Sequence, residues 1–197
     1  MKRREFMSLL GTGVVLGACG TDVRQAEAQM GMGMGHGMMG GCPLCGSGAN
    51  VWIPEHLPPP RNAAWLQRFG KIHGLERLSL RQYETDSTKY GERMPYQMVI
   101  PQEGDHIAWI ERLYGAYGIK PSTRSFPLRP TSSPDDAFRV AMQLESELVP
   151  EYDQLIANAE DQITPAVLNV ILRQTRWHYT MFSHAARMLE MGGGMMR

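Results

Sequence analysis

The stretch VIPQEGDHIAWIERLYGAY, residues 99–117, decides the fold that we expect for this chain. Apolar residues recur in it at spacings of three and four, which is typical of a helix with one face packed on a core. Glu103 and His106, whose side chains are costly to bury, interrupt that face. We therefore expect both side chains to point inward. The apolar members of the face are Val99, Ile107, Ile110, Leu113 and Tyr117.

Three more helices are predicted by their end signals. Ser133-Pro134 and Thr164-Pro165 each place a capping hydroxyl before a proline, which favours a helix start. Gly91 and Gly118 are typical helix stops. No segment alternates with a period of two, so we expect no sheet. The expected helices span about 62–90, 95–118, 133–159 and 164–191.

The lengths of the connections predict how these helices are arranged. Short loops join the first helix to the second and the third to the fourth, so each pair should be antiparallel. Residues 119–133, at about 3.3 Å per residue, could cover about 50 Å, more than the height of such a helix. We therefore predict an all-α, ferritin-like four-helix bundle over 62–191 with one long crossover.

Each of the other helices also carries polar residues on its apolar face. Counted from the helix ends, these residues lie at one height near the middle of the bundle, where three carboxylates and two imidazoles should converge. An unpaired buried carboxylate costs several kcal/mol, and a cation removes that cost. A metal-free core with Glu–His hydrogen bonds is the alternative. The predicted metal ligands are Glu76, Glu103, His106, Glu145 and His178.

This ordered set resembles the ferritin-like di-iron carboxylate superfamily, whose ligands come as Glu, Glu-x-x-His, Glu, Glu-x-x-His. The chain is also similar to a bacterial ferritin-like family of unknown function, over residues 76–83, 103–106 and 113–119 and at His178 before Phe182, and distantly to rubrerythrins. The resemblance implies iron or manganese that reacts with oxygen or peroxide. The chain departs from the pattern at Thr175-x-x-His178, where a fourth carboxylate is replaced.

Several other residues are expected around this site. Tyr83 and Tyr152 should line it as core aromatics that also donate hydrogen bonds, with Thr175 beside them. We expect His73 to be a partly exposed neighbour of Glu76, or a group that supports the ligands. His184 should be structural, and Glu147, which falls off the apolar face, should be solvated.

The N-terminus has the features of an export signal. Residues 1–18 combine a basic start with a short apolar run, too short to span a bilayer. Arg3-Arg4 resembles the twin-arginine signal, and residues 16–19 resemble a lipobox in which Cys19 is lipidated. Cleavage after Ala28 is the alternative. We expect a protein of the periplasm or cell envelope whose contact with the membrane is a lipid anchor.

Residues 19–61 are predicted to be a flexible tether that ends in a Pro-rich linker, and residues 192–197 a disordered tail. The tether is either a plain spacer or a copper-capturing segment, because thioethers and imidazole suit Cu(I). Cys42 and Cys45 form either a disulfide or a metal site, completed by His56, His36 or a second subunit, or shared with the methionines. The soft ligands of the tether are Met30, Met32, Met34, His36, Met38 and Met39. A second, smaller group of methionines lies near the C-terminus, at Met191, Met195 and Met196.

The charge of the chain argues against one class of partner, nucleic acids. The 197 residues include 20 Lys and Arg against 20 Asp and Glu, so no basic excess exists for a nucleic-acid partner. Two functions remain open. The chain is either an exported metalloprotein, with oxidoreductase activity as one outcome, or a non-enzymatic copper-binding envelope protein in which the bundle is a scaffold. Metal ions are the expected partners, and pairing into a homodimer is left open.

Overall fold

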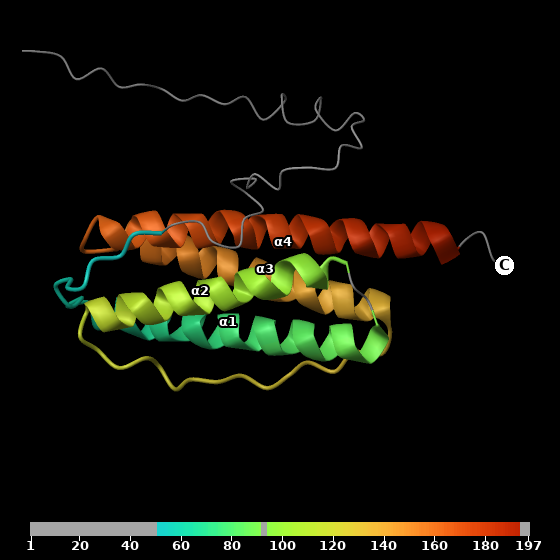
Figure 1. Ribbon diagram of the computed structural model, residues 1–197, viewed down its shortest axis with the longest axis horizontal. Helices are drawn as coiled ribbons and strands as arrows, with labels where there is room; N and C mark the ends of the chain where they lie inside the picture. The colour runs from blue at the N-terminus through green and yellow to red at the C-terminus, as the bar shows by residue number, and fades with distance from the viewer. Residues whose placement is uncertain (1–50, 92–93, 194–197) are drawn as a thin grey trace, which may run out of the picture. The chain divides into compact units, whose positions relative to one another are not determined.

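The computed structural model describes residues 51–91 and 94–193, which form four helices and, within those ranges, no strand (Figure 1). The prediction of an all-α chain is confirmed. The predictions for the export signal, Cys19, the Met/Gly tract and Cys42/Cys45 lie outside the described residues, as do Met195 and Met196. The helices are α1 (Ala63–Tyr90), α2 (Tyr96–Ala116), α3 (Pro134–Ala157) and α4 (Ile163–Gly193).

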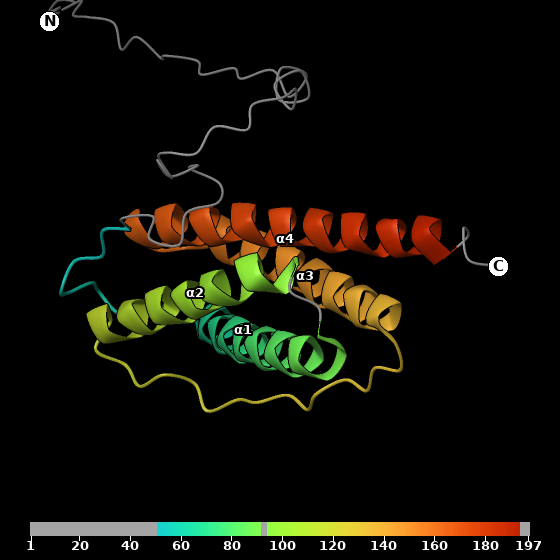
Figure 2. The same cartoon turned by 45° about the vertical axis from the view of Figure 1, so that its right-hand side comes forward.

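The long crossover has the predicted course. Helices α1 and α2 are antiparallel, as are α3 and α4, and the crossover after α2 runs along the bundle before α3 begins (Figures 1 and 2). Helices α2 and α3 therefore run in the same direction. Helix α3 packs on α1 and α4, while α2 packs on the same two helices. Among the described helices, none is both long enough and apolar enough to cross a membrane.

Three of the helix ends follow from their local sequence. The side chain of Asn62 accepts hydrogen bonds from the backbone N–H groups of Ala64 and Trp65, at 3.0 and 3.2 Å. Ser133 caps α3 as predicted, through a 3.1 Å bond from the N–H of Asp136. Gly91 ends α1 with a φ of 69°, a left-handed conformation that glycine adopts without a steric cost.

Helix α4 differs from the prediction at both ends. It begins at Ile163, because Asp161 Oδ1 accepts 2.8 Å bonds from the N–H groups of Ile163 and Thr164. The hydroxyl of Thr164, the predicted cap, instead contacts the hydroxyl of Tyr117. The helix also continues to Gly193, since its terminal glycines can still bond to carbonyls one turn earlier.

The end of the predicted tether packs against the bundle. Ile53 is only 8% exposed and belongs to the hydrophobic core. Its burial stabilises the contact between this part of the chain and the bundle. The N–H of Leu57 donates a 2.8 Å bond to the carbonyl of Ala116, and Arg112 donates to the carbonyl of Val51. Residues 51–57, which were predicted to be part of the tether, therefore lie against the bundle.

The crossover is fastened to α1 by close packing and by two arginines. A Cβ atom added at Gly74 would lie 2.8 Å from the carbonyl oxygen of Arg124, so only glycine allows this approach. Arg77 donates to the carbonyls of Ser122 and Arg124, and Arg81 donates a 2.7 Å bond to the carbonyl of Phe126. These contacts fix the connection that determines the order of the four helices.

Candidate metal centre

The five predicted ligands come from all four helices and are fully buried, each with 0% exposure. They form two groups in which ligand atoms lie within 4.8 Å of one another. One group is Glu76, Glu103 and His106, and the other is Glu103, Glu145 and His178. Glu103 belongs to both groups, so its carboxylate lies between the two histidines.

The Nδ1 atoms of both histidines face these carboxylates. His106 Nδ1 lies 3.2 Å from Glu76 Oε2 and 4.0 Å from Glu103 Oε1. His178 Nδ1 lies 2.9 Å from Glu103 Oε1 and 3.5 Å from Glu145 Oε1. The single oxygen Glu103 Oε1 is thus within reach of both rings, as expected of a ligand shared between neighbouring positions.

One glutamine contacts the opposite edge of each imidazole ring. His106 Nε2 donates to Gln174 Oε1 at 2.8 Å, and His178 Nε2 donates to Gln102 Oε1 at 2.7 Å. Because an amide oxygen only accepts, Nε2 of each ring carries a proton, and Nδ1 is the ring nitrogen that a metal on the carboxylate side could bind. Sequence reasoning missed both glutamines, although each lies four residues before the histidine of its own helix.

Two buried tyrosines donate hydrogen bonds to Glu145 and Glu76, the carboxylates that lie on either side of Glu103. The Tyr83 hydroxyl donates to Glu145 Oε1 at 2.6 Å, and the Tyr152 hydroxyl donates to Glu76 Oε1. Burial, followed by the neighbouring carboxylate charges, raises the pKa of both tyrosines well above the usual value. Both therefore keep their protons and act as hydrogen-bond donors near neutral pH.

The centre has an internal two-fold pattern that relates α1–α2 to α3–α4. The matching residues are Glu76 and Glu145, Tyr83 and Tyr152, Gln102 and Gln174, and His106 and His178. The pattern breaks at one position, where Glu103 on α2 corresponds to Thr175 on α4. Thr175 is fully buried, and its hydroxyl has no hydrogen-bond partner among the described residues.

The charges of this centre are poorly compensated by the protein alone. Burial, then the charges of Glu76 and Glu145, raises the pKa of Glu103 well above its usual value. Within the described residues, no hydrogen bond is formed by either oxygen of Glu103, by Glu145 Oε2 or by His178 Nδ1, although His178 Nδ1 and Glu103 Oε1 lie only 2.9 Å apart. Buried groups of this kind are costly unless a proton or a cation joins them. Carboxylate and imidazole together make a donor set that fits iron or manganese.

Glu76 and His106 form the better compensated pair. Burial alone would raise the pKa of Glu76, but the charge and hydrogen bond of His106 outweigh it, so this pKa lies below its usual value. Burial alone would lower the pKa of His106, but the Glu76 charge outweighs it, so this pKa is raised. The pair therefore favours a carboxylate facing a protonated imidazole when no metal is bound.

Comparison with solved structures agrees with this architecture. The chain is similar to a crystal structure described as ferritin-like, diiron-carboxylate proteins from Bacillus anthracis str. Ames, with a TM-score of 0.57 over 62% of this chain and 95% of that one. The fold is ferritin-like. At 12% sequence identity the likeness concerns the fold alone. No protein-family model matches the sequence, and no curated protein matches it.

Two histidines of this ferritin-like bundle lie elsewhere than expected. His73 is fully buried rather than partly exposed, and its Nε2 atom lies 3.3 Å from Glu111 Oε1 instead of beside Glu76. Burial, then the charge of Arg77, lowers the pKa of His73. His184 is exposed on α4, so it is not part of the core. Glu147 is exposed and pairs with Arg129 at 2.7 Å, as its place off the apolar face indicated.

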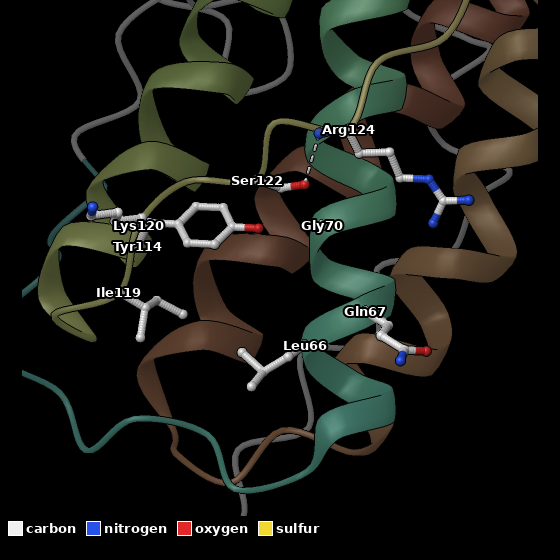
Figure 3. Close-up of a pocket in the computed structure, with 8 residues that line it drawn as sticks. All are labelled: Leu66, Gln67, Gly70, Tyr114, Ile119, Lys120, Ser122 and Arg124. Carbon is white, nitrogen blue, oxygen red and sulfur yellow. Dashed lines mark hydrogen bonds between the residues drawn. The ribbon is translucent and has the colours of Figure 1, made fainter.

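The surface pocket in Figure 3 is separate from the centre. It has a volume of about 400 Å³ and lies between α1, the end of α2 and the start of the crossover. None of the five candidate ligands lines it. The carboxylate and histidine groups are instead sealed inside the ferritin-like bundle, and such a cluster suggests metal binding. The lining residues are Leu66, Gln67, Gly70, Tyr114, Ile119, Lys120, Ser122 and Arg124.

Proposed function

We propose that this protein binds iron or manganese in the middle of its bundle and uses the metal in redox chemistry with oxygen or peroxide. The observation that carries the proposal is that Glu103 is shared by two buried groups, each of two carboxylates and one imidazole. The ligands would be Glu76, Glu103, His106, Glu145 and His178. Both groups have the oxygen and nitrogen donors that suit these metals.

The side chains around the centre would each have a distinct part in holding the metal. Glu76 and His106 would bind metal on one side of Glu103, and Glu145 and His178 would bind metal on its other side. A bound iron or manganese ion would supply the electrons for reduction of oxygen or peroxide. The full burial of the five ligands restricts access to small molecules.

The number of ligands favours tight binding of one ion over two, because two ions would have to share five protein side chains. Three carboxylates carry three negative charges, which exceed the charge of one divalent ion but fall short of the charge of two. The missing fourth carboxylate, at Thr175, therefore weakens the second position. One firmly held ion, with a second held in part by water, is the arrangement that we propose.

The metal content of the full-length protein tests this function. Protein purified from cells without added metal should contain iron or manganese, and a Glu103→Ala/His106→Ala double variant should have lost it. Glu147→Ala is the matched control, because this carboxylate is exposed on α3. Circular dichroism establishes that each variant is folded. Equal metal content in the double variant and the control would rule out this centre.

A second candidate function is copper binding in the tether, and the Met/His composition of residues 30–41 favours it. Deletion of residues 20–50 should then abolish Cu(I) binding by the tether and leave the iron or manganese content unchanged. The deletion stops at 50 because Ile53 is part of the core. Loss of the iron or manganese on this deletion would argue against a centre inside the bundle.

We propose further that the protein is exported and anchored by lipid at Cys19. The basic start and the short apolar run of residues 1–18 support this location. Replacing Arg3 and Arg4 with lysines should leave the protein in the cytoplasm, as cell fractionation would measure. Cys19→Ser should release exported protein from the membrane fraction.

A further inference from the structure

Helix α4 carries methionines and a histidine along its outer face. Met181, His184, Met188 and Met191 follow one another at spacings of three, four and three, so they lie on one side of the helix. Met181 is half-buried, His184 is exposed, and Met188 and Met191 are 52% and 64% exposed. We call these four residues the outer stripe.

The outer stripe is distinct from the buried centre. His178 and Phe182, on the same helix, are fully buried and face the core, whereas the stripe continues on the solvent side of α4. Towards its C-terminus the stripe passes into the part of α4 that extends past the other helices in both views (Figures 1 and 2). None of the proposed iron or manganese ligands belongs to it.

The spacing of the outer stripe allows several side chains to meet at one ion. Residues three and four apart on a helix have Cβ atoms about 5–6 Å apart. Methionine has three rotatable bonds and an adaptable thioether, so its sulfur can move towards a shared point. No hydrogen bond or ion pair to the imidazole of His184 occurs among the described residues. Both of its ring nitrogens are therefore available at the surface.

The chemistry of these side chains selects a soft cation. Thioether sulfur and imidazole nitrogen are ligands that suit Cu(I), whereas Mg²⁺, Ca²⁺ and Mn²⁺ prefer oxygen. The outer stripe contains no carboxylate. The carboxylate of Glu190, next to Met191, is engaged by Arg139 at 2.6 Å. We propose that Met181, His184 and Met188 form a surface site for Cu(I), with Met191 as a further thioether ligand.

A purely apolar docking face is the competing interpretation of the outer stripe, and conservative substitutions separate the two. Leucine keeps the apolar surface of methionine but removes the sulfur. Copper binding is therefore lost in Met→Leu variants, whereas apolar docking is retained. The site is independent of the bundle centre, so it stands whether or not iron or manganese binds to Glu103 and its neighbours.

The test uses the full-length protein with Cu(I), under anaerobic and reducing conditions, in competition with a chromophoric Cu(I) chelator. The Met181→Leu/Met188→Leu/Met191→Leu variant should bind about one Cu(I) per chain fewer than the wild type. Met98→Leu/Met142→Leu is the matched control, with half-buried methionines off the stripe. It should bind as much Cu(I) as the wild type.

A local measurement separates this site from any copper held by the tether. The imidazole resonances of His184 should shift on Cu(I) addition in the wild type and stay fixed in the triple variant. Unchanged Cu(I) stoichiometry in the triple variant, or His184 resonances that do not respond in the wild type, would overturn the proposal. So would an equal loss of Cu(I) in the control variant.

Discussion

The side chains of Gln102 and Gln174 determine which nitrogen of each buried imidazole faces the carboxylates. Each glutamine accepts the Nε2 proton of the histidine on the other helix of the α2–α4 pair. Without this acceptor, a buried ring could place its proton on either nitrogen, and one of the two choices blocks metal binding at Nδ1. The two amides therefore support metal binding without touching the metal.

Gln174→Leu should weaken metal binding by about 10–100-fold, because His106 loses the group that fixes its tautomer. Isothermal titration calorimetry with Mn(II) measures the affinity. Gln143→Leu, on the exposed side of α3, is the control and should bind as the wild type does. If both variants bound Mn(II) equally well, the orientation of His106 would not depend on Gln174.

Thr175 is the residue at which the two halves of the centre differ, and restoring a carboxylate there should restore the second metal position. Thr175→Glu should raise the number of Mn(II) ions bound per chain, since the fourth negative charge balances a second divalent ion. Without metal, the same variant should unfold more easily because it buries another carboxylate. Thr180→Glu, exposed on α4, should change neither property.

At the scale of the elements, the helix ends could be predicted where the signal is local. Ser133 and Gly91 act on groups within a few residues of themselves, so their sequence context is sufficient. The predicted start of α4 was wrong because Asp161 accepts hydrogen bonds from the N–H groups of Ile163 and Thr164, and both Asp161 and Thr164 are residue types that cap helices well. The choice between them depends on Tyr117, which is far away in the sequence.

The candidate site, like the helix ends, could be predicted where the signal lies within one helix and not where it depends on residues far away in the sequence. Glu103 and His106 interrupt an apolar face, which is visible in one helix alone. The full burial of Gln102 and His73 was not predicted, because it depends on partners from other helices. The contact between His178 and Gln102 joins residues 76 positions apart, and no periodicity within a helix indicates such a pair.

Gly74 is the point where α1 and the crossover touch most closely. In Gly74→Ala the new Cβ would lie 2.8 Å from the Arg124 carbonyl oxygen and 2.9 Å from the Phe126 ring. We expect a loss of about 1–3 kcal/mol in the free energy of unfolding, measured with urea on metal-free protein.

Gly104→Ala is the matched control for this experiment, since a Cβ there meets nothing within 4 Å. Gly104 also lies inside a helix, so this change should raise the free energy of unfolding by about 0.5–1 kcal/mol. A similar gain for Gly74→Ala would mean that the crossover yields without cost and does not fix the order of the helices.

At the scale of the whole molecule, the buried centre connects folding to pH and to metal. The pKa of Glu103 in the folded chain is raised above 4.5, and that of His106 is raised above 6.5. The metal-free folded state thus binds more protons than the unfolded state above these values. Its stability should therefore fall as the pH rises. The lowered pKa of Glu76 acts in the opposite sense at pH below 4.5, and the lowered pKa of His73 does so at pH below 6.5.

The melting temperature of metal-free protein should consequently decrease from about pH 6 to about pH 8. Mn(II) should remove most of this decrease, because a bound cation replaces the protons that the carboxylates and imidazoles would otherwise need. Glu103→Gln, which is neutral at every pH, should flatten the profile of the metal-free protein. A melting temperature that rises over this range without metal would mean that the carboxylates of the centre are already compensated by the protein itself, and the need for a cation would disappear.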